Sequence, residues 1–314
     1  MESGHGRGLQ CPRTLRQCLS RWVHLGFGMG GRQPDSLRGD QLRGSHCDLL
    51  HRCRVPVPEN QQEMTRGSIE YLLCDVSEVR ETQSAHPWLA SLLSPAEVKR
   101  SDRLRHASDR IAYRCAHLVL RLLAARRLGA DVRSAGDLEF TRCCRSCGGP
   151  HGKPQVTDAE VSLSRSGTMV LVGSAPPSSP IGVDIEGRPS DVFPGFDDYV
   201  LAPSERTSNC TNSDRRRLEL WVAKEAALKT TGHGLSVEPN KLEVVRTEVV
   251  RTSEETSAID GSGAWASSIR APDYPEIDGL NLASVPCRPS HAAALSCVDQ
   301  LPVTPLTLSD LLIE

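Results

Sequence analysis

The sequence has few aromatic residues, no long apolar run and almost no net charge. Only 4% of its 314 residues are Phe, Trp or Tyr, so we expect a core built mainly from Leu, Val, Ile and Ala. No apolar run approaches the about 20 residues that span a bilayer, which argues against a membrane protein. The formal net charge of −2 argues against a broad basic surface that holds nucleic acid. A chain of this length can bury one substantial core or two smaller ones.

Cysteine, in contrast, is frequent. The 12 cysteines are scattered, and no apolar secretory signal precedes them, so we expect reduced thiols in a cytoplasmic protein. One cluster stands out, Cys143, Cys144 and Cys147, with His151 close behind. Cys144 and Cys147 have metal-ligand spacing, but no second Cys-x-x-Cys pair completes a zinc site. Two interpretations stay open, thiols beside a Gly-rich turn or a structural metal site.

Residues 1–66 differ from the rest of the chain. They contain many Gly and Arg residues, no Lys, and no sustained helical or strand period. We expect an N-terminal extension that is disordered, or a start annotated too far upstream, with Met64 as the true initiator. The segment before residue 34 is Arg-rich with Glu2 as its only acid, a faint similarity to an organelle transit peptide.

The remaining sequence predicts two halves of similar content, each with a long helix and a small sheet. In the first half, residues 67–176, a capping box at Ser94 and Glu97 starts one helix, and a longer helix ends at Gly129. Residues 175–180 (APPSSP) predict a linker, and the second half, 177–314, contains a long helix. That helix is expected at about 214–230, and strands are expected near 69–76, 161–163, 169–172, 181–186, 241–250, 264–269, 280–285 and 291–297.

Three acids and two lysines of the second half carry the most information. Asp184 and Glu186 alternate with apolar residues in a predicted strand, so both carboxylates lie on one face. Glu225 and Lys229 are one turn apart on the long helix and share a face, and Lys224 precedes them. Carboxylate oxygens bind hard cations such as Mg²⁺. A bound Mg²⁺ and nearby lysines can together bind the negative charges of a diphosphate. Either motif alone also fits a solvated strand or a surface ion pair, but the apolar flanks favour a buried site.

These motifs resemble those of the 4′-phosphopantetheinyl transferase superfamily, and in particular the two-half, surfactin-synthetase-activating type. The resemblance covers about residues 70–300. The matching segments, in chain order, are GKP (152–154), the Ser-x-Ser-Gly turn (164–167), GVDIE (182–186), WVAKEAALK (221–229) and GHGL (232–235).

The resemblance implies a fold and a reaction. The expected fold is α+β (α/β), with two pseudo-symmetric lobes, each a small sheet packed on a long helix, and an active site in the cleft between them. The implied reaction moves the phosphopantetheine arm of coenzyme A onto a serine of an acyl or peptidyl carrier protein. The other product is adenosine 3′,5′-bisphosphate. Because one chain contains both lobes, we expect a monomer that acts in the cytoplasm in fatty-acid or secondary-metabolite synthesis.

The resemblance also assigns roles in the second lobe. Asp184, Glu186 and Glu225 are the expected Mg²⁺ ligands. Lys229 is expected to meet a diphosphate oxygen, and Lys224 either does the same or pairs with an acid. Glu225 is the preferred base for the serine proton and Asp184 is the alternative, while a metal-bound water is an equally reasonable relay.

In the first lobe, the resemblance assigns residues to coenzyme A. Lys153 and its loop are expected at the adenosine end with its 3′-phosphate, and Arg110 is a second candidate for that anion. Arg165 and Ser166 lie in the turn that commonly reads Ser-His-Ser-Gly in the family. Arg165 replaces the phosphate-binding histidine, which keeps a cationic donor and removes a titrating group. The alternative for Arg165 is an exposed turn residue without a substrate contact.

Two other functions remain in competition at this point. The first is a non-catalytic carrier-protein binder with the same fold. The second is a Mg²⁺-dependent phosphodiesterase, although such enzymes usually have more metal ligands, often His.

Overall fold

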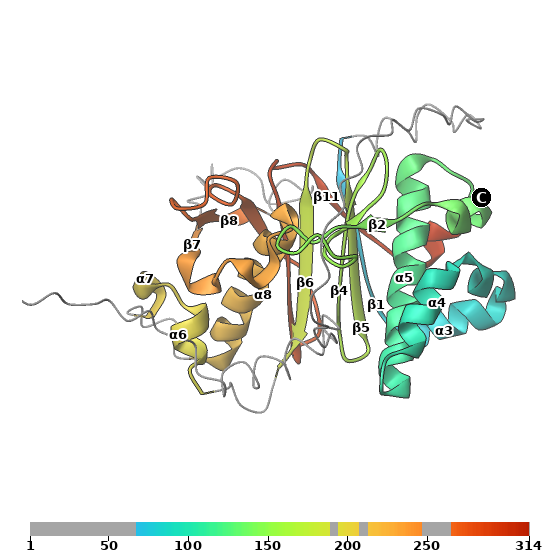
Figure 1. Ribbon diagram of the computed structural model, residues 1–314, viewed down its shortest axis with the longest axis horizontal. Helices are drawn as coiled ribbons and strands as arrows, with labels where there is room; N and C mark the ends of the chain where they lie inside the picture. The colour runs from blue at the N-terminus through green and yellow to red at the C-terminus, as the bar shows by residue number, and fades with distance from the viewer. Residues whose placement is uncertain (1–66, 189–193, 207–212, 247–264, 314) are drawn as a thin grey trace, which may run out of the picture.

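The computed structural model describes residues 67–188, 194–206, 213–246 and 265–313. The extension expected for residues 1–66 lies outside them. The described residues form an α+β fold, which confirms the predicted fold class (Figure 1). Among these residues, no helix is both long and apolar enough to cross a membrane.

The first half contains one long helix and most strands of the first sheet. Its elements are β1 (Ile69–Asp75), α3 (Val76–Ala85), η1 (Pro87–Leu92), α4 (Pro95–Asp102), α5 (Ala107–Leu128), η2 (Val132–Asp137), β2 (Thr141–Arg142), β3 (Pro154–Gln155), β4 (Glu160–Ser166) and β5 (Met169–Ala175). The capping box at Ser94 and Glu97 is confirmed, and Gly129 ends α5 in the left-handed conformation. The long helix begins at Ala107, and its N-cap residue His106 makes no side-chain hydrogen bond.

The second half repeats this content in another order. Its elements are β6 (Ile181–Gly187), α6 (Phe196–Val200), α7 (Pro203–Arg206), α8 (Asp214–Thr231), η4 (Gly234–Ser236), η5 (Pro239–Lys241), β7 (Glu243–Arg246), β8 (Trp265–Arg270), β9 (Asn281–Ser284), β10 (His291–Cys297), β11 (Val303–Leu306) and η7 (Ser309–Leu311). The long helix α8 ends at Gly232, which is left-handed as the sequence predicted.

Two sheets stand side by side in the centre of the molecule. Their strand orders are β11-β1-β5-β4 and β6-β10-β9-β8-β7, and β2 pairs only with β3. The edge strands β4 and β6 are neighbours where the sheets meet (Figure 1). Helix α5 covers the outer face of the first sheet and α8 covers the second.

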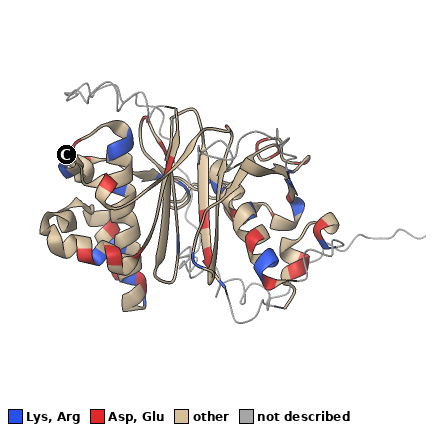
Figure 2. Ribbon diagram, turned by 180° about the vertical axis from the view of Figure 1, so that it is seen from behind, with Lys and Arg blue, Asp and Glu red and all other residues tan. Residues whose placement is uncertain are grey.

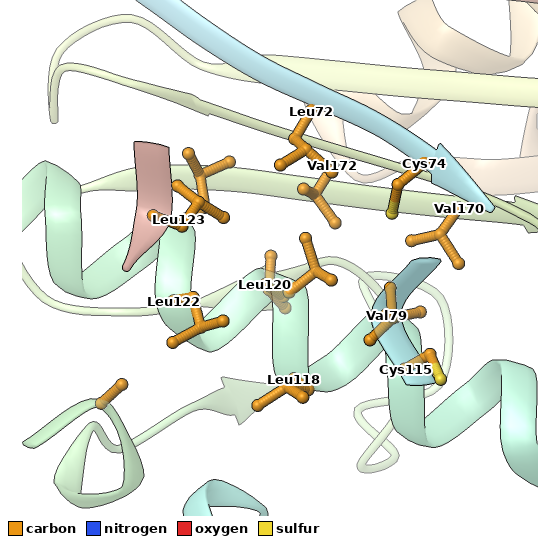
Figure 3. Close-up of a cluster of buried hydrophobic side chains, with 14 of the residues drawn as sticks. Leu72, Cys74, Val79, Cys115, Leu118, Leu120, Leu122, Leu123, Val170 and Val172 are labelled. Carbon is orange, nitrogen blue, oxygen red and sulfur yellow. The ribbon is translucent and has the colours of Figure 1, made fainter. Parts of the chain in front are cut away.

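Three apolar clusters hold these layers together. One lies between α5 and the first sheet, where Leu123 of the helix points towards the strands that carry Leu72 and Val172 (Figure 3). A second lies between α8 and the second sheet. The third joins the two sheets, with Leu171 from one side and Val183 and Leu295 from the other. The two halves therefore share one core layer.

The end of the chain returns to the first sheet. β11 pairs in parallel with β1, and Leu311 is buried in the cluster under α5. These residues were expected in the second lobe, 177–314. The boundary at residue 176 stays a prediction, and the described sheet pairing shows that β11 belongs to the first sheet.

Candidate active site

The acidic residues predicted from the sequence lie where β6 packs against α8. In β6, Ile181, Val183 and Ile185 enter the core between the sheets, so Gly182, Asp184 and Glu186 take the opposite face. Figure 2 shows acidic positions (red) along the strand at the junction of the sheets. A Cβ on Gly182 would stand 2.0 Å from the carbonyl oxygen of Ala226, so only glycine allows this close approach of strand and helix.

Lys229 joins the two elements through Asp184. Its ammonium lies 2.5 Å from Asp184 Oδ1 and donates a hydrogen bond to Ser164 Oγ at 3.0 Å. Ser164 Oγ in turn donates to Asp184 Oδ1 at 2.8 Å. Asp184 is 2% exposed, so this ion pair is shielded from water and is stronger than a surface pair.

Glu186 is held by the neighbouring strand. Ser166 Oγ donates to Glu186 Oε2 at 3.0 Å and accepts from the Gly187 N–H at 2.9 Å. Ser166, predicted to bind the coenzyme, is therefore placed as a support for the carboxylate. Glu225 is buried at the same junction, on α8.

The site has more carboxyl groups than the charge of Lys229 alone can stabilise in ionised form. Burial, and next the charge of Asp184, raise the pKa of Glu186 to about 8, although Lys229 and Ser166 act in the opposite sense. Burial, and next Asp184, also raise the pKa of Glu225 to about 8. Two neighbouring carboxyl groups thus resist ionisation because the charged form is desolvated and repelled.

This excess of carboxyl groups fits a hard divalent cation. Among the described residues, Asp184 Oδ2 and Glu225 Oε1 are buried oxygens without a hydrogen-bond partner. All three side chains offer carboxylate oxygens, the donors that Mg²⁺ prefers. The three do not form a cluster with ligand atoms within 4.8 Å of one another, so shared ligation requires side-chain rotation. The ligand assignment stays a prediction that the donor chemistry supports.

Arg165 lies on the other face of β4 from Ser164 and Ser166 and is 7% exposed. Burial lowers its pKa, and the charge of Asp109 and the hydroxyl of Tyr113 on α5 offset that effect. Within the described residues its guanidinium makes no hydrogen bond or ion pair. It is not an exposed turn residue, and a guanidinium in this state is suited to an anionic ligand.

The other predicted coenzyme residues have their own partners. Arg110 Nη1 donates to the carbonyl oxygens of Leu104 and Arg105, at 2.9 and 3.2 Å, at the start of α5. Lys153 forms an ion pair of 2.6 Å with Glu160 and donates to the Thr230 carbonyl oxygen at 3.1 Å. Lys153 therefore connects the first half to the end of α8.

Lys224 does not reach the carboxylate site. Its ammonium is fully buried, lies 2.5 Å from Glu205 Oε2 and donates to the Val200 carbonyl oxygen at 2.6 Å. Of the two roles expected for it, the structure places it in the one that pairs it with an acid. The physical reason is position, because it projects from α8 towards α6 and α7 and not towards β6.

A cavity of about 490 Å³ opens between the halves beside Lys153. Arg145 and Lys153 line it from the first half, and Thr230, Gly232 and Glu276 line it from the second. Arg145 donates to the Thr231 carbonyl oxygen at 2.9 Å and forms an ion pair with Glu276 at 3.0 Å. The cavity is thus an interlobe cleft at the C-terminal end of α8, with charged side chains at its wall.

Two parts of this arrangement were missed by the sequence reasoning. Ser164 was read only as a turn residue, yet it links Lys229 to Asp184. Serines at alternate positions 162, 164 and 166 were the available signal, because they predict one polar strand face. Arg145 and Glu276 gave no such signal, because 131 residues separate them in the chain.

Comparison with known proteins agrees with this geometry. Residues 180–279 match the family described as the 4′-phosphopantetheinyl transferase superfamily. The matched segment makes up about a third of the chain. It is also 32% identical over 160 residues to a Synechocystis sp. protein that is named, provisionally, as a 4′-phosphopantetheinyl transferase. That alignment covers 48% of this chain and 61% of the relative.

The superfamily match includes the whole carboxylate site. β6 and α8, with Asp184, Glu186, Glu225 and Lys229, lie inside residues 180–279. Lys153 and Arg165 lie before it, in the first half of the chain. The family match therefore includes the acidic residues and Lys229. The roles proposed for Lys153 and Arg165 lie outside that match and are argued from their positions in the structure.

Proposed function

We propose that this protein is a 4′-phosphopantetheinyl transferase of the two-half, surfactin-synthetase-activating type. It transfers the phosphopantetheine arm of coenzyme A to a serine of acyl or peptidyl carrier proteins and releases adenosine 3′,5′-bisphosphate. The observation that carries this proposal is the meeting of three carboxylates and Lys229 where β6 packs on α8, within the matched superfamily segment.

The reaction forms one bond and breaks one. The serine oxygen of the carrier attacks the phosphorus that bears the pantetheine arm, and the bond from that phosphorus to the bridging oxygen breaks. Asp184, Glu186 and Glu225 would hold Mg²⁺, which when bound supplies positive charge to the diphosphate oxygens. We assign Lys229 to donate to a diphosphate oxygen, and Arg165 to a phosphate on the first-half side. Both stabilise charge that grows in the transition state.

Glu225 is the better placed of the two candidate bases. Asp184 is held through Oδ1 by Lys229 and Ser164, although its Oδ2 has no partner, whereas neither oxygen of the Glu225 carboxyl group accepts a hydrogen bond from the described residues. A carboxylate oxygen without a donor is free to accept the serine proton. We therefore assign Glu225 as base and Asp184 to orienting Lys229.

The interlobe cavity is the proposed site of the adenosine end of coenzyme A. Lys153 and Arg145 provide cationic groups at its wall. The proposal keeps lobes at 67–176 and 177–314, with β11 returning to the first sheet. Since both walls come from one chain, the enzyme works as a monomer, and we place it in the cytoplasm.

An intact-mass assay tests the proposal. Purified protein is incubated with coenzyme A, Mg²⁺ and an apo carrier protein, and the carrier gains the mass of the phosphopantetheine arm. Glu225→Gln and Asp184→Ala are expected to lower the rate by about 100-fold or more. Glu219→Gln is the matched control, because Glu219 is on the same helix but pairs with Arg215 and Arg216 at the surface.

The same assay separates the competing functions. An unchanged carrier that binds the protein tightly would indicate a non-catalytic binder. Loss of coenzyme A without any carrier would indicate a phosphodiesterase. Near wild-type transfer by Glu225→Gln would show that the carboxylate assignment is wrong.

A further inference from the structure

The loop between β2 and β3 brings together three metal-binding side chains outside the carboxylate site. The ligand atoms of Cys144, Cys147 and His151 all lie within 4.8 Å of one another. Cys147 Sγ is 3.0 Å from His151 Nε2. None of these residues takes part in the proposed transfer reaction, and all three are at least partly accessible to solvent.

The backbone of the loop is shaped around these groups. The Cys144 N–H donates to the Gly149 carbonyl oxygen at 3.0 Å, and the Gly148 N–H donates to the Cys144 carbonyl oxygen at 2.8 Å. These two hydrogen bonds close the chain on itself between Cys144 and Gly149, and Cys147 lies inside the closed segment.

Gly149 leaves the space in which the ligands meet. A Cβ on this residue would stand 3.3 Å from Cys147 Sγ and 3.3 Å from His151 Nε2. Gly148 has a φ of +67°, which favours glycine and turns the chain from the cysteines towards the histidine. The sequence Cys-x-x-Cys-Gly-Gly-x-His is therefore matched to the loop conformation.

We propose that Cys144, Cys147 and His151 bind a Zn²⁺ ion. Two thiolates and an imidazole are the soft and borderline donors that zinc prefers, and tetrahedral Zn²⁺ places such atoms about 3.5–3.8 Å apart. The observed group needs only small adjustments to reach these separations. Binding releases the two thiol protons to solvent and involves no redox change.

Cys143 is not part of this group. Its Sγ is 3.9 Å from the Gly148 carbonyl oxygen, on an exposed side chain, and it is absent from the cluster. We therefore assign the fourth position to a water molecule. Cys143 consequently serves as a matched control in the same loop.

The metal fixes one wall of the interlobe cavity. The loop carries Arg145, which contacts Thr231 and Glu276 of the second half, and Lys153 follows the loop directly. Arg142 Nη1 also donates to the Gly152 carbonyl oxygen at 2.6 Å at the exit of the loop. Zinc binding thus stabilises the segment that joins the two halves at the end of α8.

Metal analysis of the purified full-length protein, prepared without a polyhistidine tag, tests this inference. We expect about one zinc per chain after reconstitution and dialysis for the wild type and for Cys143→Ser. We expect Cys144→Ser and Cys147→Ser to lose it. No stoichiometric zinc in the wild type would overturn the proposal, and loss of zinc in Cys143→Ser would overturn the water assignment.

Thiol alkylation of the unmodified protein provides a test that requires no variant. With zinc, iodoacetamide should label Cys143 and spare Cys144 and Cys147 in peptide maps, and a chelator should make all three reactive. Equal labelling with and without zinc, or a Cys144–Cys147 disulfide, would exclude the metal site. Neither measurement uses coenzyme A or a carrier, so the outcome is independent of the proposed transferase activity.

Discussion

One ammonium group serves several carboxylates at the β6–α8 junction. The Lys229 ammonium contacts Asp184 and Ser164. Its charge favours ionisation of Glu186 and Glu225, but burial and the charge of Asp184 outweigh it and raise the pKa of each to about 8. A single buried cation thus leaves the site short of positive charge. This shortage is a residue-level reason to expect cation binding, because a divalent ion would relieve the repulsion.

Arg165 leads to a prediction about pH. An arginine stays charged throughout the physiological range, so coenzyme A binding should not change between pH 6 and 7.5 through this position. Arg165→His should bind coenzyme A normally near pH 6 and lose about tenfold in affinity as the pH rises through about 6.5, because the imidazole then loses its charge. Measurement of KM for coenzyme A against pH checks this.

Arg165→Lys is the control, because it keeps the charge at every pH tested. A flat profile for Arg165→His, with KM equal to that of the wild type, would mean that residue 165 does not contact a phosphate.

The two lysines of α8 show what the sequence could and could not predict. Glu225 and Lys229 are one turn apart, so helical periodicity predicted correctly that they share a face. Lys224 and Lys229 are five positions apart, which separates them by about 140° around the helix. That angle excludes a shared face, but only the fold shows that Glu205 is the partner of Lys224. A single sequence does not predict which residues from distant segments contact each other.

At the scale of elements, Gly182 decides how closely β6 and α8 pack. A Cβ there would lie 2.0 Å from Ala226 O and 2.5 Å from Thr230 N, both backbone atoms that cannot turn aside. Gly182→Ala should therefore destabilise the protein by about 3 kcal/mol or more and separate Asp184 from Glu225. Urea unfolding measures the first effect, and transferase rate measures the second.

Gly187→Ala is the matched control on the same strand. Its Cβ would meet His291 Nε2 at 3.5 Å and Ser166 Oγ at 3.6 Å, which are ordinary contacts. If the two variants had equal stability, the close approach of strand and helix would not limit the fold.

A second element-level prediction concerns the contact of α4 with α5. His117 is buried, and its Nδ1 is 3.1 Å from Glu97 Oε1. Burial lowers the pKa of His117 to about 4, and its bond to Glu97 offsets only part of this effect. The unfolded chain binds a proton at about 6.5 and the folded chain does not, so stability falls as the pH drops from about 6.5 to about 4.

His117→Gln keeps a donor for Glu97 and removes the titration. Between pH 7 and 4.5, the free energy of unfolding should fall by about 2 kcal/mol less in His117→Gln than in the wild type. Urea titrations at both pH values check the difference. Parallel pH profiles for the two proteins would contradict a neutral, buried His117.

The element boundaries were largely predictable because local signals define them. The capping box of α4 and the glycines after α5 and α8 act within a few residues, and the structure confirms them. The start of α5 lacks such a signal, because its N-cap residue His106 makes no side-chain hydrogen bond. The contact of β4 with β6 had no comparable local signal, since their linking serines pair across about 20 residues.

At the scale of the whole molecule, two similar halves were visible in the sequence but their shared core was not. Alternating apolar residues predicted β6 as a strand, and only the structure shows that Ile181 and Val183 pack with Ile69 and Leu171 of the first sheet. β11 has only four residues and contains Pro305, so little in the sequence indicated a strand there. Its pairing with β1 is a long-range consequence of the fold. The halves are therefore not independent folding units.

This shared core predicts cooperative unfolding. Leu295 of β10 is fully buried between the sheets, so Leu295→Ala should cost about 2–5 kcal/mol. Because the core layer is common to both sheets, the variant should lower amide protection in α5 of the first half as much as in α8 of the second. Hydrogen-exchange mass spectrometry of peptides from the two helices measures this. Val298→Ala, at an exposed position just after β10, is the control and should leave both helices unchanged. Loss of protection in α8 alone would show that the halves unfold separately and that the layer between the sheets does not couple them.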